Sequence, residues 1–403
     1  MITFQTPLDL VRVLHPESPV ACVRPERVST AAAWFQNHFP GDVLYAVKAN
    51  PSPWALDAMY EAGMRWFDVA SLEEIELVAN RFDDAVLAYM HPIKSRNSIE
   101  RAYFDYGVRI FVLDCEAELQ KILEATDFAK DLTLVVRMAV SNDGASMPLS
   151  GKFGCFGDDA AHLLQAARSY ADELGVSFHV GSQCMDPGAY RIAMDTVSNT
   201  IVQAAVTVDI VDVGGGFPAL YPGMQPPELQ SYIDVINQVF EEMPVLFNAD
   251  LWCEPGRALV ADSTSIVAKV ELVRDGRVYL NDGAYGNLFD AAHCKWPFPM
   301  EVHRVSGKTS IHSKPFTIYG PTCDSIDVLD GVFDLPADIQ EGDYIEFGMM
   351  GAYGTAMSTR FNGFGDTKTY RVRNSISQTM YETQAEEQRR YENNVIFLPR
   401  REA

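Results

Sequence analysis

Basic residues are scarce in this chain: 32 Lys and Arg stand against 55 Asp and Glu, which gives a formal net charge of −23. A surface this acidic repels nucleic acid and anionic membranes, so we expect neither as a partner, whereas small cationic molecules would be attracted. Long apolar runs are also absent, since no stretch reaches the roughly 18 residues of a membrane span. The N-terminal segment MITFQTPLDLVRVLHP has no basic start followed by an apolar run, so we expect no signal peptide.

Cysteine is present but lacks a pattern. The residues are scattered, their number is odd, and no C-x-x-C pair occurs. This argues against a disulfide framework and a zinc site, so we expect no metal and a reducing, cytoplasmic location. The seven cysteines are Cys22, Cys115, Cys155, Cys184, Cys253, Cys294 and Cys323.

Between about residues 20 and 262 the chain alternates short β-rich runs with longer segments of helical periodicity. Eight such pairs over about 240 residues match a (β/α)8 barrel, and a doubly wound open sheet is the alternative that periodicity leaves open. The predicted strands are VLYAVKA from Val43, RWFDVAS from Arg65, AVLAYM from Ala85, RIFVLD from Arg109, TLVVRM from Thr133, VSFHVGS from Val176, IVDVGGG from Ile210 and DLWCEPG from Asp250. The clearest predicted helices are Ser71–Asn80, Ala117–Thr126, Asp159–Leu174, Gly188–Ala205 and Pro227–Glu242.

After about residue 262 the pattern changes to strand-like runs separated by Gly, Asp and Pro turns, for example KPFTIYGP and DYIEFGMMGAYG. This pattern predicts a mostly antiparallel β domain. We therefore expect a barrel over 20–262 and a β domain formed by 1–19 and 263–403, which ends in a charged C-terminal tail.

Polar and glycine residues gather at the ends of the predicted barrel strands. The carboxyl ends of barrel strands form one rim, and active sites are built there. Residues more than 200 positions apart in the sequence would therefore meet at one place. They are Lys48, Asp68, His179, Gly214–Gly216, Glu254 and Arg257.

Each of these residues also has a plain structural interpretation. Lys48 could be a solvated strand cap, but a lysine inside a barrel rim loses hydration, which lowers its pKa and frees the amine for a Schiff base. The triple glycine is either a tight turn or a run of backbone N–H groups that cradle a phosphate. Glu254 and Arg257 form either a surface ion pair or the holders of two ends of one ligand, a cationic ring nitrogen and a phosphate.

The remaining candidates are weaker when taken alone. His179 fits a core histidine, and Asp68 fits a cap or a salt-bridge partner. Cys323, beside Asp324 in YGPTCDSID, fits a small side chain next to a turn. Tyr353, in a glycine-rich aromatic segment, fits packing.

Seven segments taken together resemble the fold-type III pyridoxal 5'-phosphate (PLP) decarboxylases, the family of ornithine, lysine, arginine and diaminopimelate decarboxylases. Between Lys48 and Phe364 they occur in the family order: YAVKAN, FDVAS, FHVGSQC, DVGGGFP, CEPGR, GPTCDSID and GAYGTAMSTRFNGF. The resemblance implies an α/β fold with a PLP-binding (β/α)8 barrel and a C-terminal β domain, as in alanine racemase. It also implies a homodimer with shared active sites.

The resemblance assigns roles by matching position. It implies that Lys48 carries PLP as a Schiff base, that Glu254 pairs with the pyridine nitrogen, and that His179 stacks on the ring. Asp68 would lie behind the lysine. The implied phosphate ligands are Ser182, Gly215, Gly216, Gly256, Arg257 and Tyr353.

Other positions resemble the residues that handle the substrate. Cys323 resembles the group that returns a proton to the α-carbon, and Asp324 the carboxylate that binds the distal amine, both from the other subunit. Phe289 and Asp290 resemble an aromatic-acidic pair near the substrate, although their spacing from Tyr285 is shorter than in the eukaryotic enzymes. Phe361 is a further implied substrate-binding position.

Two carboxylates, Asp324 and Asp290, suit a distal ammonium, and no basic cluster is evident that would bind a diacid. We therefore expect decarboxylation of L-ornithine to putrescine, of L-lysine to cadaverine, or of both, within polyamine biosynthesis. An arginine or diaminopimelate decarboxylase of the same fold is one alternative. A non-catalytic, decarboxylase-like regulatory binding protein is the alternative from another class, and the joint retention of Lys48, Glu254, Arg257 and Cys323 speaks against it.

Overall fold

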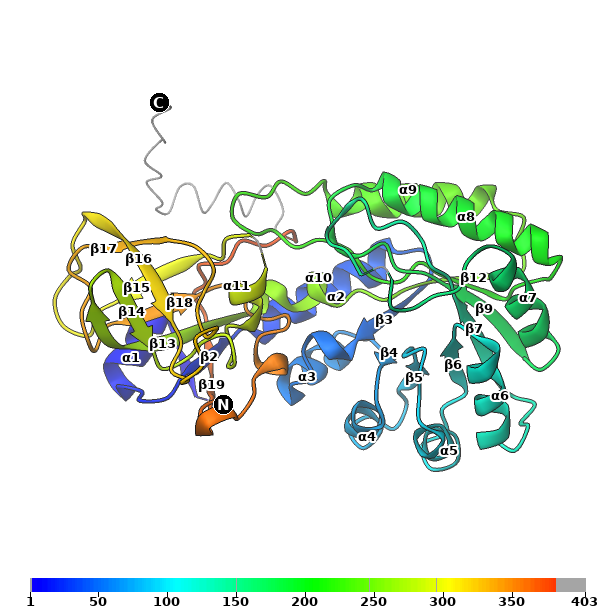
Figure 1. The fold of residues 1–403 in the computed structure, drawn as a ribbon, viewed down its shortest axis with the longest axis horizontal. Coiled ribbons are helices and arrows are strands. Elements are labelled where there is room, and N and C mark those ends of the chain that lie inside the picture. Colours follow the sequence, from blue (N-terminus) through cyan, green and yellow to red (C-terminus); the bar gives the residue numbers. More distant parts are fainter. Residues whose placement is uncertain (1, 150, 246, 295, 382–403) are drawn as a thin grey trace.

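The computed structural model describes residues 2–149, 151–245, 247–294 and 296–381. One half of the molecule is a closed barrel of eight parallel strands surrounded by helices, and the other half contains a nine-stranded sheet (Figure 1). This confirms the predicted (β/α)8 barrel with a β domain and excludes the open-sheet alternative. No helix in the described ranges is both long and apolar enough to cross a membrane.

Each barrel strand overlaps one of the eight predicted runs. The strands close in the order β11-β12-β3-β4-β5-β6-β7-β9, with β9 paired to β11. They are β3 (Asp42–Ala46), β4 (Trp66–Val69), β5 (Val86–Tyr89), β6 (Ile110–Leu113), β7 (Thr133–Arg137), β9 (Glu173–Ser177), β11 (Ile210–Asp212) and β12 (Asp250–Cys253).

The barrel helices follow from simple apolar spacing. The first, α2 (Pro25–His38), has proline at its first position and buries Val28, Ala31, Ala32 and Phe35, which form one stripe along the helix. The others are α3 (Pro53–Glu61), α4 (Leu72–Ala79), α5 (Arg96–Phe104), α6 (Glu116–Ala125), α7 (Gly157–Arg168), α8 (Gly188–Ala204), α9 (Leu229–Glu242) and α10 (Arg257–Val260).

The predicted boundary between one helix and the strand that follows it is wrong. The predicted helix over 159–174 ends at Arg168, and β9 begins at Glu173 rather than at Val176. Leu174 pairs with Leu134 of β7, so the barrel takes this residue as a strand. Its apolar side chain fits both periodicities, and the pairing decides between them.

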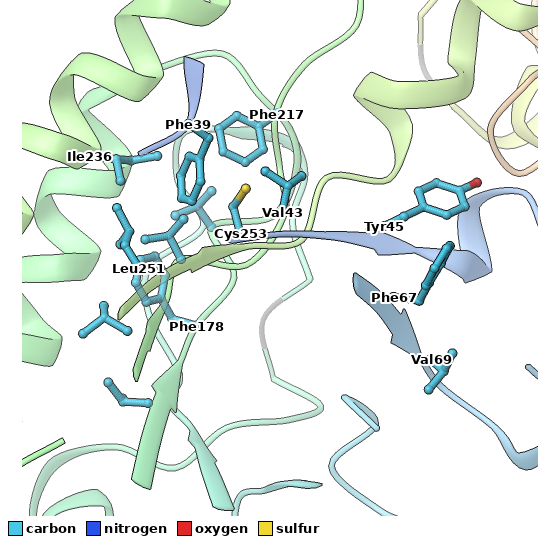
Figure 2. Packing of buried hydrophobic residues seen from close by; sticks show 14 of the residues in the cluster. Phe39, Val43, Tyr45, Phe67, Val69, Phe178, Phe217, Ile236, Leu251 and Cys253 are labelled. Carbon is cyan, nitrogen blue, oxygen red and sulfur yellow. The ribbon is translucent and has the colours of Figure 1, made fainter. Parts of the chain in front are cut away.

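Alternate residues of the strands form two separate apolar layers. Leu44, Ala88 and Ile110 belong to a cluster inside the barrel together with Val112, Val135, Ile210 and Trp252. Their strand neighbours point outward and pack under the helices, where Figure 2 shows Phe39, Ile236 and Leu251 grouped beside β3 and β12. The barrel is therefore a filled core, and an open site is left only at its rim.

The nine-stranded sheet is built around β13 (Thr264–Arg274), which pairs antiparallel with β2 (Val20–Val23), β14 (Arg277–Leu280) and β18 (Tyr344–Phe347). Parallel pairs also occur, because β19 runs beside β1 and β2, and β14 runs beside β16. The other strands are β1 (Thr3–Phe4), β15 (Met300–His303), β16 (Ser313–Tyr319), β17 (Phe333–Pro336) and β19 (Lys368–Val372). The short helices α1 (Pro7–Leu14) and α11 (Phe289–His293) belong to this half of the chain.

The predicted boundary at residue 20 needs correction. Strand β2 lies beyond that boundary, yet it pairs with β13 and β19 of the β domain rather than with the barrel. We therefore propose that the barrel unit begins with α2 and ends near residue 262. The predicted C-terminal tail lies mostly outside the described residues.

Candidate active site

A cavity of about 260 Å³ opens at the carboxyl ends of the barrel strands. Its volume is close to the lower end of the ~300–1,000 Å³ usual for small-molecule sites. The residues that line it come from the ends of the barrel strands and, through Tyr353, from the β domain. Nine of the predicted residues line it: Lys48, His179, Ser182, Gly215, Gly216, Glu254, Gly256, Arg257 and Tyr353.

Lys48 lies just after β3, in a single 3-10 turn (Val47–Ala49), and its Nζ donates to Asp68 Oδ2 at 2.5 Å. The lysine side chain is 43% exposed to the cavity, whereas Asp68 is buried in β4. Desolvation alone would lower the pKa of Lys48, but the carboxylates of Asp68 and Glu254 outweigh it and raise that pKa. The expected lowering of the pKa is therefore wrong, because the amine is held by an acid at hydrogen-bond distance.

Glu254 follows β12 and presents its carboxyl group to the cavity while remaining buried. Its Oε1 has no hydrogen-bond partner among the described residues. Burial, together with the nearby Asp212 and Asp68, raises its pKa well above the ordinary range, and Lys48 and Arg137 oppose this rise. A cationic ring nitrogen at Oε1 would satisfy both the hydrogen bond and the charge.

His179 is a neutral ring at the wall of the cavity. Burial lowers its pKa well below the usual value, and the nearby Arg137 and Lys48 lower it further. Its Nδ1 accepts the N–H of Gly181 at 2.9 Å, so Nε2 carries the proton. A neutral imidazole fixed in this way offers a flat face to an aromatic ligand.

The triple glycine is a backbone surface that tolerates no side chain. A Cβ on Gly214 would lie 2.1 Å from Phe178 O, and one on Gly216 would lie 2.6 Å from Gly181 O. Both residues also have positive φ angles, +67° and +109°. Only glycine fits here, which leaves backbone N–H groups open to an anion.

Arg257 provides the cation beside this turn. Its Nε donates to Ser182 Oγ at 3.2 Å, and its Nη1 donates to Tyr221 Oη at 2.8 Å. The ring of Tyr353 lies 4.9 Å from the guanidinium carbon, and the residue has a positive φ of 53°, a strained backbone state often found at functional sites.

The structure does not bring the predicted substrate residues into this cavity. Asp290 is buried, and its Oδ2 accepts from Arg257 Nη1 at 2.6 Å, so here it is the counter-ion of the arginine rather than a free carboxylate. Phe289 stacks on His293. Cys323 is exposed, Asp324 accepts from Tyr285 Oη at 2.6 Å, and Phe361 packs on the same Tyr285 ring.

Three charged residues at or behind the site were not among the predicted residues. Arg137 and Lys152 line the cavity, and Asp212 ends β11 behind Glu254. Arg137 and Asp212 were visible as charged side chains in otherwise apolar runs, TLVVRM and IVDVGGG, so the rule that drew attention to Lys48 would have found them. Lys152 lies in a bend outside the strands, where that rule does not apply.

The comparisons agree with this geometry. Residues 26–261 match the model of the pyridoxal-dependent decarboxylases, pyridoxal binding domain. The chain belongs to this family. It is a PLP-dependent decarboxylase of basic amino acids, and PLP is its cofactor.

Relatives are similar along most of the chain. Lysine/ornithine decarboxylase of Selenomonas ruminantium is 31% identical over 349 residues, 84% of this chain and 86% of the relative. Antizyme inhibitor 2 of Xenopus laevis is 33% identical over 349 residues, 80% and 73% of the two chains. The crystal structure of Paramecium bursaria Chlorella virus arginine decarboxylase bound to agmatine has a TM-score of 0.79 at 27% identity and covers 90% and 98%.

The residues of this decarboxylase fit the cofactor. The unpartnered Oε1 of Glu254 suits the pyridine N–H, and the glycine turn with Arg257 suits the phosphate. Lys48 offers the amine that can hold the aldehyde. These groups therefore match the pyridine nitrogen, the phosphate and the aldehyde of PLP.

Proposed function

We propose that this decarboxylase acts on L-ornithine, on L-lysine or on both, and releases putrescine or cadaverine in polyamine biosynthesis. The observation that carries the catalytic part is the shared cavity of Lys48, Glu254 and Arg257 with the glycine turn. The substrate part is supported by the relative named a lysine/ornithine decarboxylase and by the exposed, ionised Asp324.

When bound, PLP supplies an electron sink for the electrons that remain after CO2 departs. Glu254 would keep the ring nitrogen protonated, because an ion pair favours the charged form. Asp68 Oδ2 would accept the proton that Lys48 Nζ must lose before its amine can react, since the two atoms are already in contact. His179 would fix the plane of the ring, and Ser182 and Arg257 would bind the phosphate.

We further propose that the enzyme is a homodimer in which Cys323 and Asp324 complete the site of the partner subunit. Both lie outside the barrel cavity in the single chain. Cys323 Sγ would deliver the proton to the α-carbon, and Asp324 would pair with the distal ammonium. A cytoplasmic location, based on the unpaired cysteines, remains part of the proposal.

Two alternatives have specific support. Arginine is favoured by the structural similarity to the viral arginine decarboxylase. A non-catalytic regulatory role is favoured by the similarity to antizyme inhibitor 2.

One experiment separates these functions. The purified protein should show the visible absorbance of lysine-bound PLP and release CO2 from L-ornithine or L-lysine faster than from L-arginine, diaminopimelate and the D-enantiomers. Fastest release from L-arginine would replace the proposed substrate. A colourless protein that neither binds added PLP nor releases CO2 would contradict the enzyme and favour the regulatory alternative.

A further inference from the structure

Asp212 and Glu254 lie side by side at the ends of two adjacent barrel strands. Strand β11 ends at Asp212, which pairs with Trp252 of the parallel β12, and Glu254 follows two residues later. Asp212 is fully buried and does not line the cavity, whereas Glu254 is 4% exposed and does. Asp212 is therefore placed to act on a ligand only through its neighbour.

The peptide of Gly214 connects the two acids. Its N–H donates to Asp212 Oδ1 at 2.8 Å, and its carbonyl accepts the N–H of Glu254 at 2.8 Å. Because Gly214 starts the turn that no side chain can enter, Asp212 holds the geometry of that turn.

The other carboxylate oxygen of Asp212 has a different environment. Oδ2 is buried without a hydrogen-bond partner among the described side chains and backbone, as is Oε1 of Glu254. Two buried carboxylate oxygens without a partner therefore lie at the ends of adjacent strands. Burial raises the pKa of Asp212, whereas the hydrogen bond from the N–H of Gly214 and the nearby Arg137 favour its charged form.

The surrounding charges come from several strands. Lys48 and Arg137 lower the pKa of Glu254, and Arg137 also lowers that of Asp212. Asp68 raises the pKa of both acids. Burial also keeps two nearby groups uncharged, because it lowers the pKa of His179 and raises that of the Cys253 thiol. Three acids therefore face two cations in this region.

We propose that Asp212 is a positioning residue of the active site, which holds the triple-glycine turn through Oδ1 and places a second buried carboxyl group behind Glu254. It thereby sets the charge that Glu254 presents to the pyridine nitrogen. This inference rests on the proposed function.

Asp212→Asn separates the two roles. Asparagine keeps a carbonyl oxygen for the N–H of Gly214, but it carries no charge. Asp212→Ala removes both contacts. Asp42→Asn is the matched control, because Asp42 is a carboxyl group with a raised pKa at the opposite end of a barrel strand, beside Asp250.

Two measurements follow the charge without relying on turnover. One is the dissociation constant of PLP for the cofactor-free protein, and the other is the pH midpoint at which the visible absorbance of bound PLP changes. Asp212→Asn should bind PLP about tenfold more weakly and shift the alkaline midpoint down by about one pH unit, since negative charge near the ring nitrogen is lost. Asp212→Ala should bind more weakly still, and Asp42→Asn should match the wild type.

The outcomes are distinct. If the wild type binds no PLP, the proposed function fails. If the wild type binds PLP and Asp212→Asn matches it in both measurements, only the inference fails, and Asp212 merely supports the turn. If the variant does not fold, infrared spectra of cofactor-free wild type and Asp282→Asn with isotope-labelled aspartate at about pH 8 decide. Absence of any protonated aspartic acid supports the charge on Asp212, and a protonated aspartic acid that persists in Asp282→Asn overturns it.

Discussion

The barrel rim and the loop that carries Cys323 and Asp324 differ in how their reactive groups are held. At the rim, Lys48, Glu254 and Arg257 follow directly from strand ends and face one cavity. In the loop, Cys323 is exposed, and Asp324 lines a separate hollow of about 530 Å³ in the β domain. The rim is assembled by the fold of one chain, whereas the loop presents its groups outward, as expected of residues that would act on another subunit.

The acids of the two regions also differ in charge state. Burial raises the pKa of Glu254 and Asp212 at the rim. In the loop, the hydrogen bond from Tyr285, supported by the N–H of Ile326, lowers the pKa of Asp324. A rim acid can hold a proton more readily as pH approaches neutrality, whereas the loop acid stays ionised and suits an ammonium group. Substitutions at the rim and in the loop should therefore affect cofactor binding, activity and stability in different ways.

The largest effect is expected for Lys48→Ala. Loss of the amine that binds the cofactor should reduce kcat by several orders of magnitude and abolish the visible absorbance of bound PLP. Activity assays and spectra of the purified variant check this. Lys308→Ala, at an exposed lysine of the β domain, is the matched control and should behave as the wild type. A Lys48→Ala protein that kept its absorbance would contradict the assignment.

Subunit mixing tests the division between rim and loop most directly. In the proposed homodimer, Lys48→Ala and Cys323→Ala should each impair every site of their own dimer, whereas a mixed dimer should contain one site with both residues intact. Random exchange of equal amounts should therefore restore roughly one quarter of wild-type activity. The assay compares the mixture with the unmixed variants, and an exposed Cys115→Ala replaces Cys323→Ala as the control. Absence of recovery after proven subunit exchange would place Cys323 outside the shared site.

The fold and the rim could be predicted because strand ends impose strong constraints. The apolar runs located all eight barrel strands, and a charged residue such as Lys48 at the end of a run marked the rim. Arg137 and Asp212 obeyed the same rule but were overlooked, so their omission was not a limit of the sequence. The pKa of Lys48 was predicted in the wrong direction, because its contact with Asp68 depends on the pairing of β3 and β4.

The β-domain residues were harder to place because loops and a short helix, not strands, carry them. Asp290 lies in α11, and no periodicity indicates that its partner is Arg257, 33 positions earlier. A buried guanidinium needs a counter-charge, but several acids could have supplied it. The role proposed for Cys323 involves another subunit, which a single sequence describes only through resemblance.

Asp290→Asn tests whether Asp290 is the counter-ion of Arg257 or a substrate-binding residue. If Asp290 is the counter-ion of Arg257, the variant should lower the free energy of unfolding of the cofactor-free protein by roughly 3–5 kcal/mol, because a buried cation loses its partner. With PLP bound, the loss should be smaller, since the phosphate supplies negative charge to Arg257. Thermal or urea unfolding with and without PLP measures both values. Unchanged stability together with a raised KM would instead favour the substrate-binding role predicted from sequence.

The smallest predicted effect is a pH dependence of stability that compares a buried acid in each half. Burial raises the pKa of Asp212 in the barrel and of Asp282 in the β domain to about 6. An unfolded aspartate titrates near 3.9, so between roughly pH 4 and 6 the folded state binds more protons than the unfolded state. The free energy of unfolding should therefore be highest below pH 4 for these groups and should fall as pH rises to 6, by up to about 2–3 kcal/mol for each acid.

Asp212→Asn and Asp282→Asn should each remove one part of that fall, and the double variant should remove both, because the sites lie in different halves and share no partner. Urea unfolding at a series of pH values measures the slopes. Asp42→Asn, whose acid is only half buried, should remove less. A wild-type slope retained in Asp212→Asn would mean that this carboxyl group is ionised across the range. Asp212 would then differ from Asp324 in burial alone.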